Sequence, residues 1–317
     1  MIETVGRTTS QTIAASELQV GDVLLMLGEG PLSQLIAWCG DSIYSHAALV
    51  ADGGDLIEAS ASGVRRYPLA QRLADAVNYH YIDAFRPLSY DGSALDDGDR
   101  ALVLAHAQSL LGIPYPLDML ATLGVVLAVR GKLPGDPAVR MVIREALDHV
   151  IRNDPTHMVC SEVVYRSFAE CAADPRGRLA PRIVLEPRGT EPFPDIDWKA
   201  LWDEVWPLLR PERQQALRAA APPTAARVGA PPSPVVAALG AAGTASVADD
   251  VLQAELDLAR QTLGVPAASP LLLRKAAQGV GEPQPIPDPN PKLVTPLDLA
   301  ATPSHTVLGR LMQRPGG

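Results

Sequence analysis

Aromatic residues and cysteines are both scarce in this sequence. Only 4% of its 317 residues are aromatic although 47% are hydrophobic, so the apolar residues are mostly Ala, Val and Leu. The three cysteines, Cys39, Cys160 and Cys171, are too few and too unevenly spaced for a disulfide framework. We therefore expect free thiols in a reducing compartment and a core built from aliphatic side chains.

Basic clusters, a secretory signal and long apolar runs are also missing. The net charge of −9 argues against a nucleic-acid partner and weakens attraction to anionic membranes. Residues 1–4 lack a positive start followed by an apolar run, so no secretory signal is visible. The longest largely apolar run, from Met119 to Val129, is shorter than the roughly 20 residues that a spanning helix needs. We expect a soluble, by default cytoplasmic protein, with export by a signal-independent route left open.

The stretch from Met158 to Phe168 has the pattern of an amphipathic helix. Apolar residues recur at helical spacing after Cys160. The turn signal Asp154-Pro155-Thr156 just before it predicts that Cys160 lies in the first helical turn. At that position unpaired backbone N–H groups and the positive end of the helix dipole favour the thiolate, which is the reactive form of cysteine.

A hairpin is predicted where the runs 45–50 and 56–59 flank an Asp-Gly-Gly turn. A three-residue loop at 51–53 would pair His46 directly with Glu58. A two-residue loop at 53–54 would instead pair His46 with Ala61 and turn Glu58 to the other face. The sequence leaves both registers open, but the hairpin can bring a carboxylate against the imidazole.

These residues together fit the needs of a nucleophilic thiol site. Such a site requires a thiolate, an imidazole that holds and passes the proton, and a polar group that orients the imidazole. Cys160, His46 and Glu58 are the candidates for these three roles. Each one alone is more often structural: a lone cysteine on an apolar helix face is usually a small core residue. The combination is what favours catalysis.

Four short segments carry a resemblance to a known family. The chain resembles the circularly permuted papain-like amidases, the YaeF/YiiX-like branch of the NlpC superfamily, which is related to the lecithin:retinol acyltransferase-like enzymes. The resemblance covers about residues 18–190 and lies in Gly21-Asp22-Val23, Tyr44-Ser45-His46, Ile57-Glu58-Ala59 and Cys160-Ser161-Glu162-Val163-Val164. In the permuted branch the histidine strand precedes the cysteine helix, and this is the order found here.

The resemblance implies a mechanism and a role for each residue. Cys160 would be the nucleophile, His46 the general base and acid, and Glu58 the third polar residue. The backbone N–H of Cys160 would hold the oxyanion, and Tyr44 is a candidate second donor. The substrate would carry an amide, ester or thioester bond, as a peptide, a lipid or another acyl conjugate does, and no cofactor is needed.

The expected fold is α+β, with an antiparallel sheet packed on the nucleophile helix in a permuted papain-like (NlpC-type) domain at 18–210. Residues 1–17 are predicted to be a loose arm. Residues 117–151 are a helical insertion, and a tryptophan-rich helix at 197–209 closes the domain. More than half of the thirty prolines lie from Pro211 onward, so 211–317 is predicted to be a mostly disordered Ala/Pro-rich tail with short helical segments.

Other readings of the same residues remain open. The enzyme could be an acyltransferase that transfers the acyl group to a lipid or amine. Alternatively, the domain could be a non-catalytic papain-like interaction protein. In the second case the Pro-rich tail would bind a protein partner. The tryptophan face at 197–209 could make a transient membrane contact. A metal site built on His157 and Cys160 is disfavoured, because no second Cys/His pair has zinc spacing. The sequence does not predict an oligomeric state.

Overall fold

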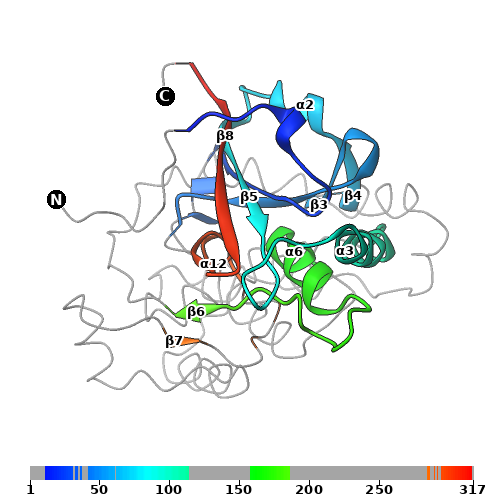
Figure 1. The fold of residues 1–317 in the computed structure, drawn as a ribbon. Helices are drawn as coiled ribbons and strands as arrows, with labels where there is room; N and C mark the ends of the chain where they lie inside the picture. The colour runs from blue at the N-terminus through cyan, green and yellow to red at the C-terminus, as the bar shows by residue number, and fades with distance from the viewer. Residues whose placement is uncertain are drawn as a thin grey trace, which may run out of the picture.

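A six-stranded sheet forms the centre of the molecule, drawn in Figure 1. The computed structural model describes residues 11–30, 33–34, 36–37, 42–60, 62–113, 158–185, 284–285, 289, 291 and 294–315. The spatial order of the strands is β4-β3-β2-β1-β5-β8, and every neighbouring pair is antiparallel. Their bounds are β1 Val23–Gly28, β2 His46–Val50, β3 Asp55–Ser60, β4 Gly63–Pro68, β5 Tyr79–Pro87 and β8 His305–Gln313. The expected α+β class with an antiparallel sheet is confirmed.

Helices cover one face of this sheet. Helix α6 (Cys160–Ala169) packs on β2 and β3, and α3 (Asp97–Ser109) packs against α6, as Figure 1 shows. Both faces of the sheet are buried, and successive side chains of β1 belong in turn to two separate hydrophobic clusters, one on each face. Val23 and Leu25 face the α6 side, whereas Leu24 and Met26 face the opposite side. The smaller elements are α2 Leu69–Leu73, α12 Pro296–Ala301, the 3₁₀ turns Ala15–Glu17 and Asp52–Gly54, and a two-stranded sheet of β6 Val184–Leu185 and β7 Gln284–Pro285.

The β2–β3 hairpin forms, but in neither of the two expected registers. Leu49 pairs with Ile57 and Val50 with Leu56, and the loop is the 3₁₀ turn Asp52–Gly54. Gly53 and Gly54 both have positive φ, at 68° and 78°, which glycine adopts without steric cost. Continuing this register would place His46 opposite Ser60, two residues from Glu58. His46 and Glu58 therefore still share one face of the sheet.

The prediction of a disordered C-terminal tail is wrong for residues 294–315. Helix α12 contacts α6 and β8, and β8 pairs with β5 along its length from His305 to Gln313, as Figure 1 shows. These elements bury Val294, Leu297 and Leu299 in the core. The domain therefore extends past residue 210, because β5 needs a partner on its outer edge and β8 supplies one.

The end of the predicted arm at 1–17 is also attached to the sheet. The backbone N–H of Ile13 donates to Arg310 O at 3.0 Å, and the N–H of Arg310 donates to Gln11 O at 2.7 Å. The predicted insertion at 117–151 and the tryptophan-rich helix at 197–209 lie outside the described residues. No helix within the described ranges has the length and apolar character required to cross a membrane.

His305 is buried where β8 begins. One ring nitrogen, Nδ1, hydrogen bonds to Leu299 O at 2.7 Å. Burial lowers the pKa of His305 to about 4, although the hydrogen bond to Leu299 and the charge of Asp22 act in the opposite direction. The native domain therefore holds His305 neutral at a pH at which the unfolded chain already binds a proton.

We expect this histidine to reduce stability as pH falls. The contribution of neutral His305 to the free energy of unfolding is fully present above pH 6.5, the ordinary pKa of histidine, and is lost as pH falls toward 4. The linkage amounts to roughly 3 kcal/mol in the free energy of unfolding. Denaturant unfolding at several pH values measures it, and His305→Asn keeps an N–H donor without titrating in this range. A His305→Asn variant with an undiminished pH slope between 6.5 and 4 would contradict the assignment.

Candidate active site

Cys160 is the first residue of helix α6, as the sequence predicted. Its side chain belongs to the core cluster and is only 6% exposed. Val159, the residue before the helix, has no side-chain acceptor for the first-turn N–H groups. The reciprocal half of the cap is present instead, because Glu162 Oε2 accepts from the Val159 N–H at 3.4 Å, and Arg166 Nε holds the same carboxylate at 2.8 Å.

The sulfur of Cys160 lies where strands β2 and β3 stop pairing. The Val50 N–H donates to Asp22 O on the β1 side. Since N–H groups point alternately to the two sides of a strand, the Ala47 N–H points toward β3. The β2–β3 ladder ends at Leu49–Ile57, however, so this group has no strand partner there. It hydrogen bonds to the Cys160 sulfur instead, as does the Ser161 N–H.

His46 joins the thiol to Glu58. Its imidazole hydrogen bonds with Cys160, and its Nε2 lies 3.0 Å from Glu58 Oε2. Because Nε2 is used by Glu58, Nδ1 is the nitrogen left for the thiol. The structure therefore brings all three candidate residues into one chain of contacts, from α6 through β2 to β3.

The protonation of this chain follows from its surroundings. Burial by itself raises the pKa of Cys160, but the charge and hydrogen bond of His46, together with the two N–H groups, lower it below 9.0. Burial by itself lowers the pKa of His46, yet the charge of Cys160, Tyr79 and the hydrogen bonds to Cys160 and Glu58 raise it well above 6.5. Both shifts favour a thiolate–imidazolium pair.

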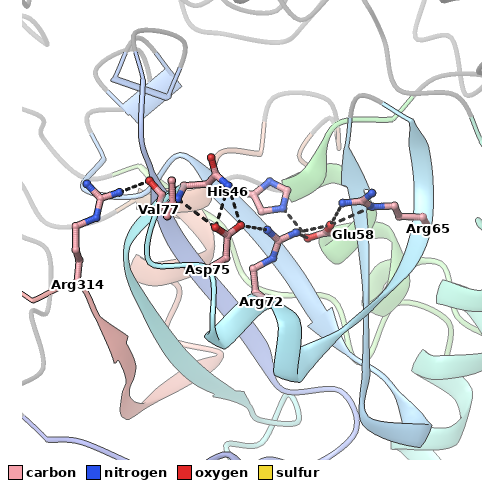
Figure 2. A network of polar contacts seen from close by, with 8 residues as sticks. His46, Glu58, Arg65, Arg72, Asp75, Val77 and Arg314 are labelled. Atoms are coloured by element: carbon pink, nitrogen blue, oxygen red, sulfur yellow. Dashed lines mark hydrogen bonds and ion pairs between the residues drawn. The ribbon is translucent and has the colours of Figure 1, made fainter.

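Glu58 is fully buried and binds two arginines as well as His46, as Figure 2 shows. Arg72 Nη2 donates to both carboxylate oxygens at 2.6 and 2.7 Å. Arg65, directly opposite on β4, donates to Oε1 through Nε at 3.2 Å and Nη2 at 3.0 Å. Burial raises the pKa of Glu58, but His46 and the two arginines outweigh it and lower the pKa to about 2.

Tyr44 does not point its hydroxyl proton at the site. The hydroxyl donates to Asp83 Oδ2 at 2.8 Å, and the ring is 1% exposed in the core. Since a phenol has a single proton to donate, Tyr44 is not available as the second oxyanion donor in this structure, and this expectation is corrected. Its hydroxyl instead helps to satisfy the buried Asp83 carboxylate.

The two arginines on Glu58 were missed by the sequence reasoning. A signal for Arg65 was present, since Gly63–Tyr67 is strand-like and follows the Glu58 strand after a short turn, an arrangement that places a residue of one strand opposite Glu58 on the other. Arg72 lies on the short helix α2 and carries no comparable signal. Among the described residues, no group of three or more His, Cys, Asp or Glu side chains is placed to hold a metal ion.

Comparisons of sequence with known proteins find no match, and comparison of structure finds a weak likeness. No family model matches the chain, and no curated protein matches it. A solved structure to which the chain is similar is the metalloprotein YiiX of Escherichia coli O157:H7, at 13% sequence identity and a TM-score of 0.41. The alignment covers 93% of this chain and 98% of that one. A likeness at this level carries no argument about function.

Proposed function

We propose that the protein is a cysteine-dependent hydrolase that cleaves an amide, ester or thioester bond. The observation that carries the proposal is the contact chain Cys160–His46–Glu58 at the start of a helix. Its members come from three separate elements, and each contact favours the charged form that thiol catalysis uses. Packing alone gives no reason for a strand histidine to join a helix-terminal thiol to a buried carboxylate.

In the first half-reaction the Cys160 thiolate attacks the carbonyl carbon of the substrate. A C–S bond forms and the carbonyl electron pair moves to oxygen, where the backbone N–H of Cys160 can donate to it, since first-turn N–H groups have no intrahelical acceptor. The intermediate collapses to the thioester as the bond to the leaving group breaks. His46 gives its proton to the leaving amine, alcohol or thiol.

In the second half-reaction His46, now neutral, takes a proton from water. The hydroxide formed attacks the thioester carbonyl, the C–S bond breaks, and the free acid leaves with the thiolate–imidazolium pair restored. Glu58 accepts from Nε2 throughout and keeps Nδ1 directed at the sulfur. An amine or alcohol in place of water would make the same site an acyltransferase.

An acyl-enzyme on Cys160 tests the proposal. Purified protein is incubated with activated acyl esters and aminocoumarin amides, and its intact mass and the release of the leaving group are followed. We expect one acyl adduct on Cys160, release that continues beyond one equivalent, and loss of both in Cys160→Ala. Adding glycinamide to the reaction separates hydrolysis from acyl transfer.

Cys171→Ala is the matched control. Cys171 lies just beyond the same helix and is buried, but burial raises its pKa and its thiol hydrogen bonds to Phe168 O at 3.2 Å. We expect this variant to acylate like the wild type. Acylation of the Cys160→Ala protein at the wild-type rate would overturn the proposal, and an adduct that never turns over would favour the non-catalytic interaction protein.

A further inference from the structure

Arg72 is the least exposed arginine among the described residues, and it lies directly behind the candidate site. Figure 2 shows it between Glu58 and Asp75, both of which it contacts. Its guanidinium is held between the rings of Tyr67 and Tyr79, with its central carbon 4.4 and 4.6 Å from their centroids. Tyr79 in turn lies beside the His46 ring, 6.4 Å between centroids.

Stability alone does not explain a cation in this position. Moving a guanidinium out of water is costly, and a buried ion pair is often no more stable than well-packed apolar residues of similar volume. Arg72 also leaves its Nε without a hydrogen-bond partner. Its contacts are concentrated on Glu58, where one nitrogen bridges both carboxylate oxygens. Arg72 therefore contacts Oε2, the oxygen that meets His46, as well as Oε1.

We propose that Arg72 is a positioning residue that keeps the buried Glu58 carboxylate ionised and directed at His46, and thereby sets the lowest pH at which Cys160 reacts. This inference rests on the proposed function. The site then consists of four residues in successive contact, Cys160–His46–Glu58–Arg72. In the proposed reaction Cys160 and His46 touch the reacting atoms, whereas Glu58 and Arg72 act through His46.

The sign of the effect follows from the charges around Glu58. The carboxylate faces His46 on β2, Arg65 on β4 and Arg72 on α2, and Arg72 itself faces Asp75 and the two tyrosines. Removing the Arg72 charge raises the pKa of Glu58, because a buried carboxyl loses a cation in contact. It also raises the pKa of Cys160 indirectly, because the His46 charge that lowers this pKa loses its ionised partner once Glu58 is protonated. Both changes move the acid limit of the reactive form to higher pH.

Arg65 offers a comparison at the same carboxylate. It contacts only Oε1, and its side chain is 38% exposed whereas that of Arg72 is 5% exposed. Water screens an exposed charge and can replace it as a partner. Loss of Arg65 should therefore move the acid limit in the same direction but by less.

The experiment measures the rate of Cys160 alkylation by iodoacetamide as a function of pH, in the Cys171→Ala background and with the full chain. The acid limb is the part of this rate–pH profile in which the rate falls as pH is lowered. We expect Arg72→Gln to move the acid limb to higher pH by about one pH unit or more, the scale of the pKa shift when an opposite charge in contact is lost. Arg72→Lys, which keeps the charge, should retain a limb near that of the parent protein. Arg65→Gln should shift it by less than Arg72→Gln does.

Arg66→Gln is the matched control. Arg66 is the next residue on β4 and is also paired with carboxylates, but these are Asp52 and Asp55 at the hairpin turn. Its removal should leave the acid limb in place. In an Arg72→Ala variant, guanidinium ion at concentrations well below those that unfold the protein should restore the limb, whereas sodium chloride at equal ionic strength should not.

The outcomes separate this inference from the proposed function. A parent protein whose Cys160 titrates like an ordinary thiol would overturn both. A parent protein with a reactive thiol at low pH, together with a folded Arg72→Gln variant that has the same acid limb, would overturn the role of Arg72 alone. Thermal unfolding of each variant shows whether it is folded. If Arg72→Gln does not fold, Arg72→Lys and the guanidinium titration of Arg72→Ala decide.

Discussion

Replacing His46 with alanine is expected to lower turnover by about 10²–10⁴-fold, the usual contribution of a positioned general acid and base. Two effects combine. The leaving group and the attacking water lose their proton carrier, and Cys160 loses the charge and hydrogen bond that lower its pKa. Burial, which raises that pKa, then dominates, so the thiolate becomes scarce at neutral pH. Steady-state hydrolysis and iodoacetamide alkylation measure the two effects separately.

His106→Ala is the control for this substitution. His106 lies on α3 with its Nε2 3.7 Å from Glu170, and it belongs to no contact that we find around Cys160. We expect wild-type alkylation in this variant. Unchanged alkylation of Cys160 in His46→Ala would show that the imidazole does not activate the thiol, and the hydrolase proposal would fail with it.

The second large effect is expected on stability, at the ion pair that joins β8 to β5. Asp83 has no exposed side-chain surface, and Arg310 holds it through Nε at 2.8 Å and Nη2 at 3.0 Å. Among the described residues, Arg310→Met leaves this buried carboxylate with the Tyr44 hydroxyl as its one side-chain hydrogen-bond donor. Removing one partner of a buried pair costs about 3–5 kcal/mol, because the remaining charge is uncompensated. Denaturant unfolding at neutral pH measures the loss.

Two variants test the cause of this loss. Adding Asp83→Asn to Arg310→Met removes the stranded charge and should recover part of the stability. Arg66→Met breaks a pair of the same kind at the exposed hairpin turn, where the side chains are 32% and 29% exposed, and should cost less than about 1 kcal/mol. Equal losses for Arg310→Met and Arg66→Met would show that burial of Asp83 is not what matters.

Local patterns placed Cys160, His46 and Glu58 on the helix and strands that the structure shows, because each of these placements depends on short-range structure. The position of Cys160 followed from a turn signal and helical spacing. Side chains along a strand alternate between the two faces of the sheet. The observed register, if continued, places His46 opposite Ser60 and not opposite Glu58, a slide of two residues, so His46 and Glu58 remain on the same face. The loop conformation set by Gly53 and Gly54 decided the register, and the sequence permitted several such loops.

Non-local pairing explains what the sequence did not reveal. The segment before β8 is rich in Pro and Ala, and the partner of β8 lies far away, since Arg310 follows Asp83 by 227 residues. Gly309 interrupts the strand pattern for a reason visible only in three dimensions. A Cβ there would lie 2.6 Å from Gln11 O, so only glycine lets residues 11–13 approach.

The position of β8 has a consequence for the order of events during synthesis. The first strands of the sheet leave the ribosome early, but the outer edge of β5 stays unpaired until His305–Gln313 has been made. Until then Asp83 lacks its arginine, and the nascent domain presents an open strand edge to its neighbours. A ribosome that stops before residue 305 therefore releases a chain that holds both Cys160 and His46 but lacks the element that completes their sheet.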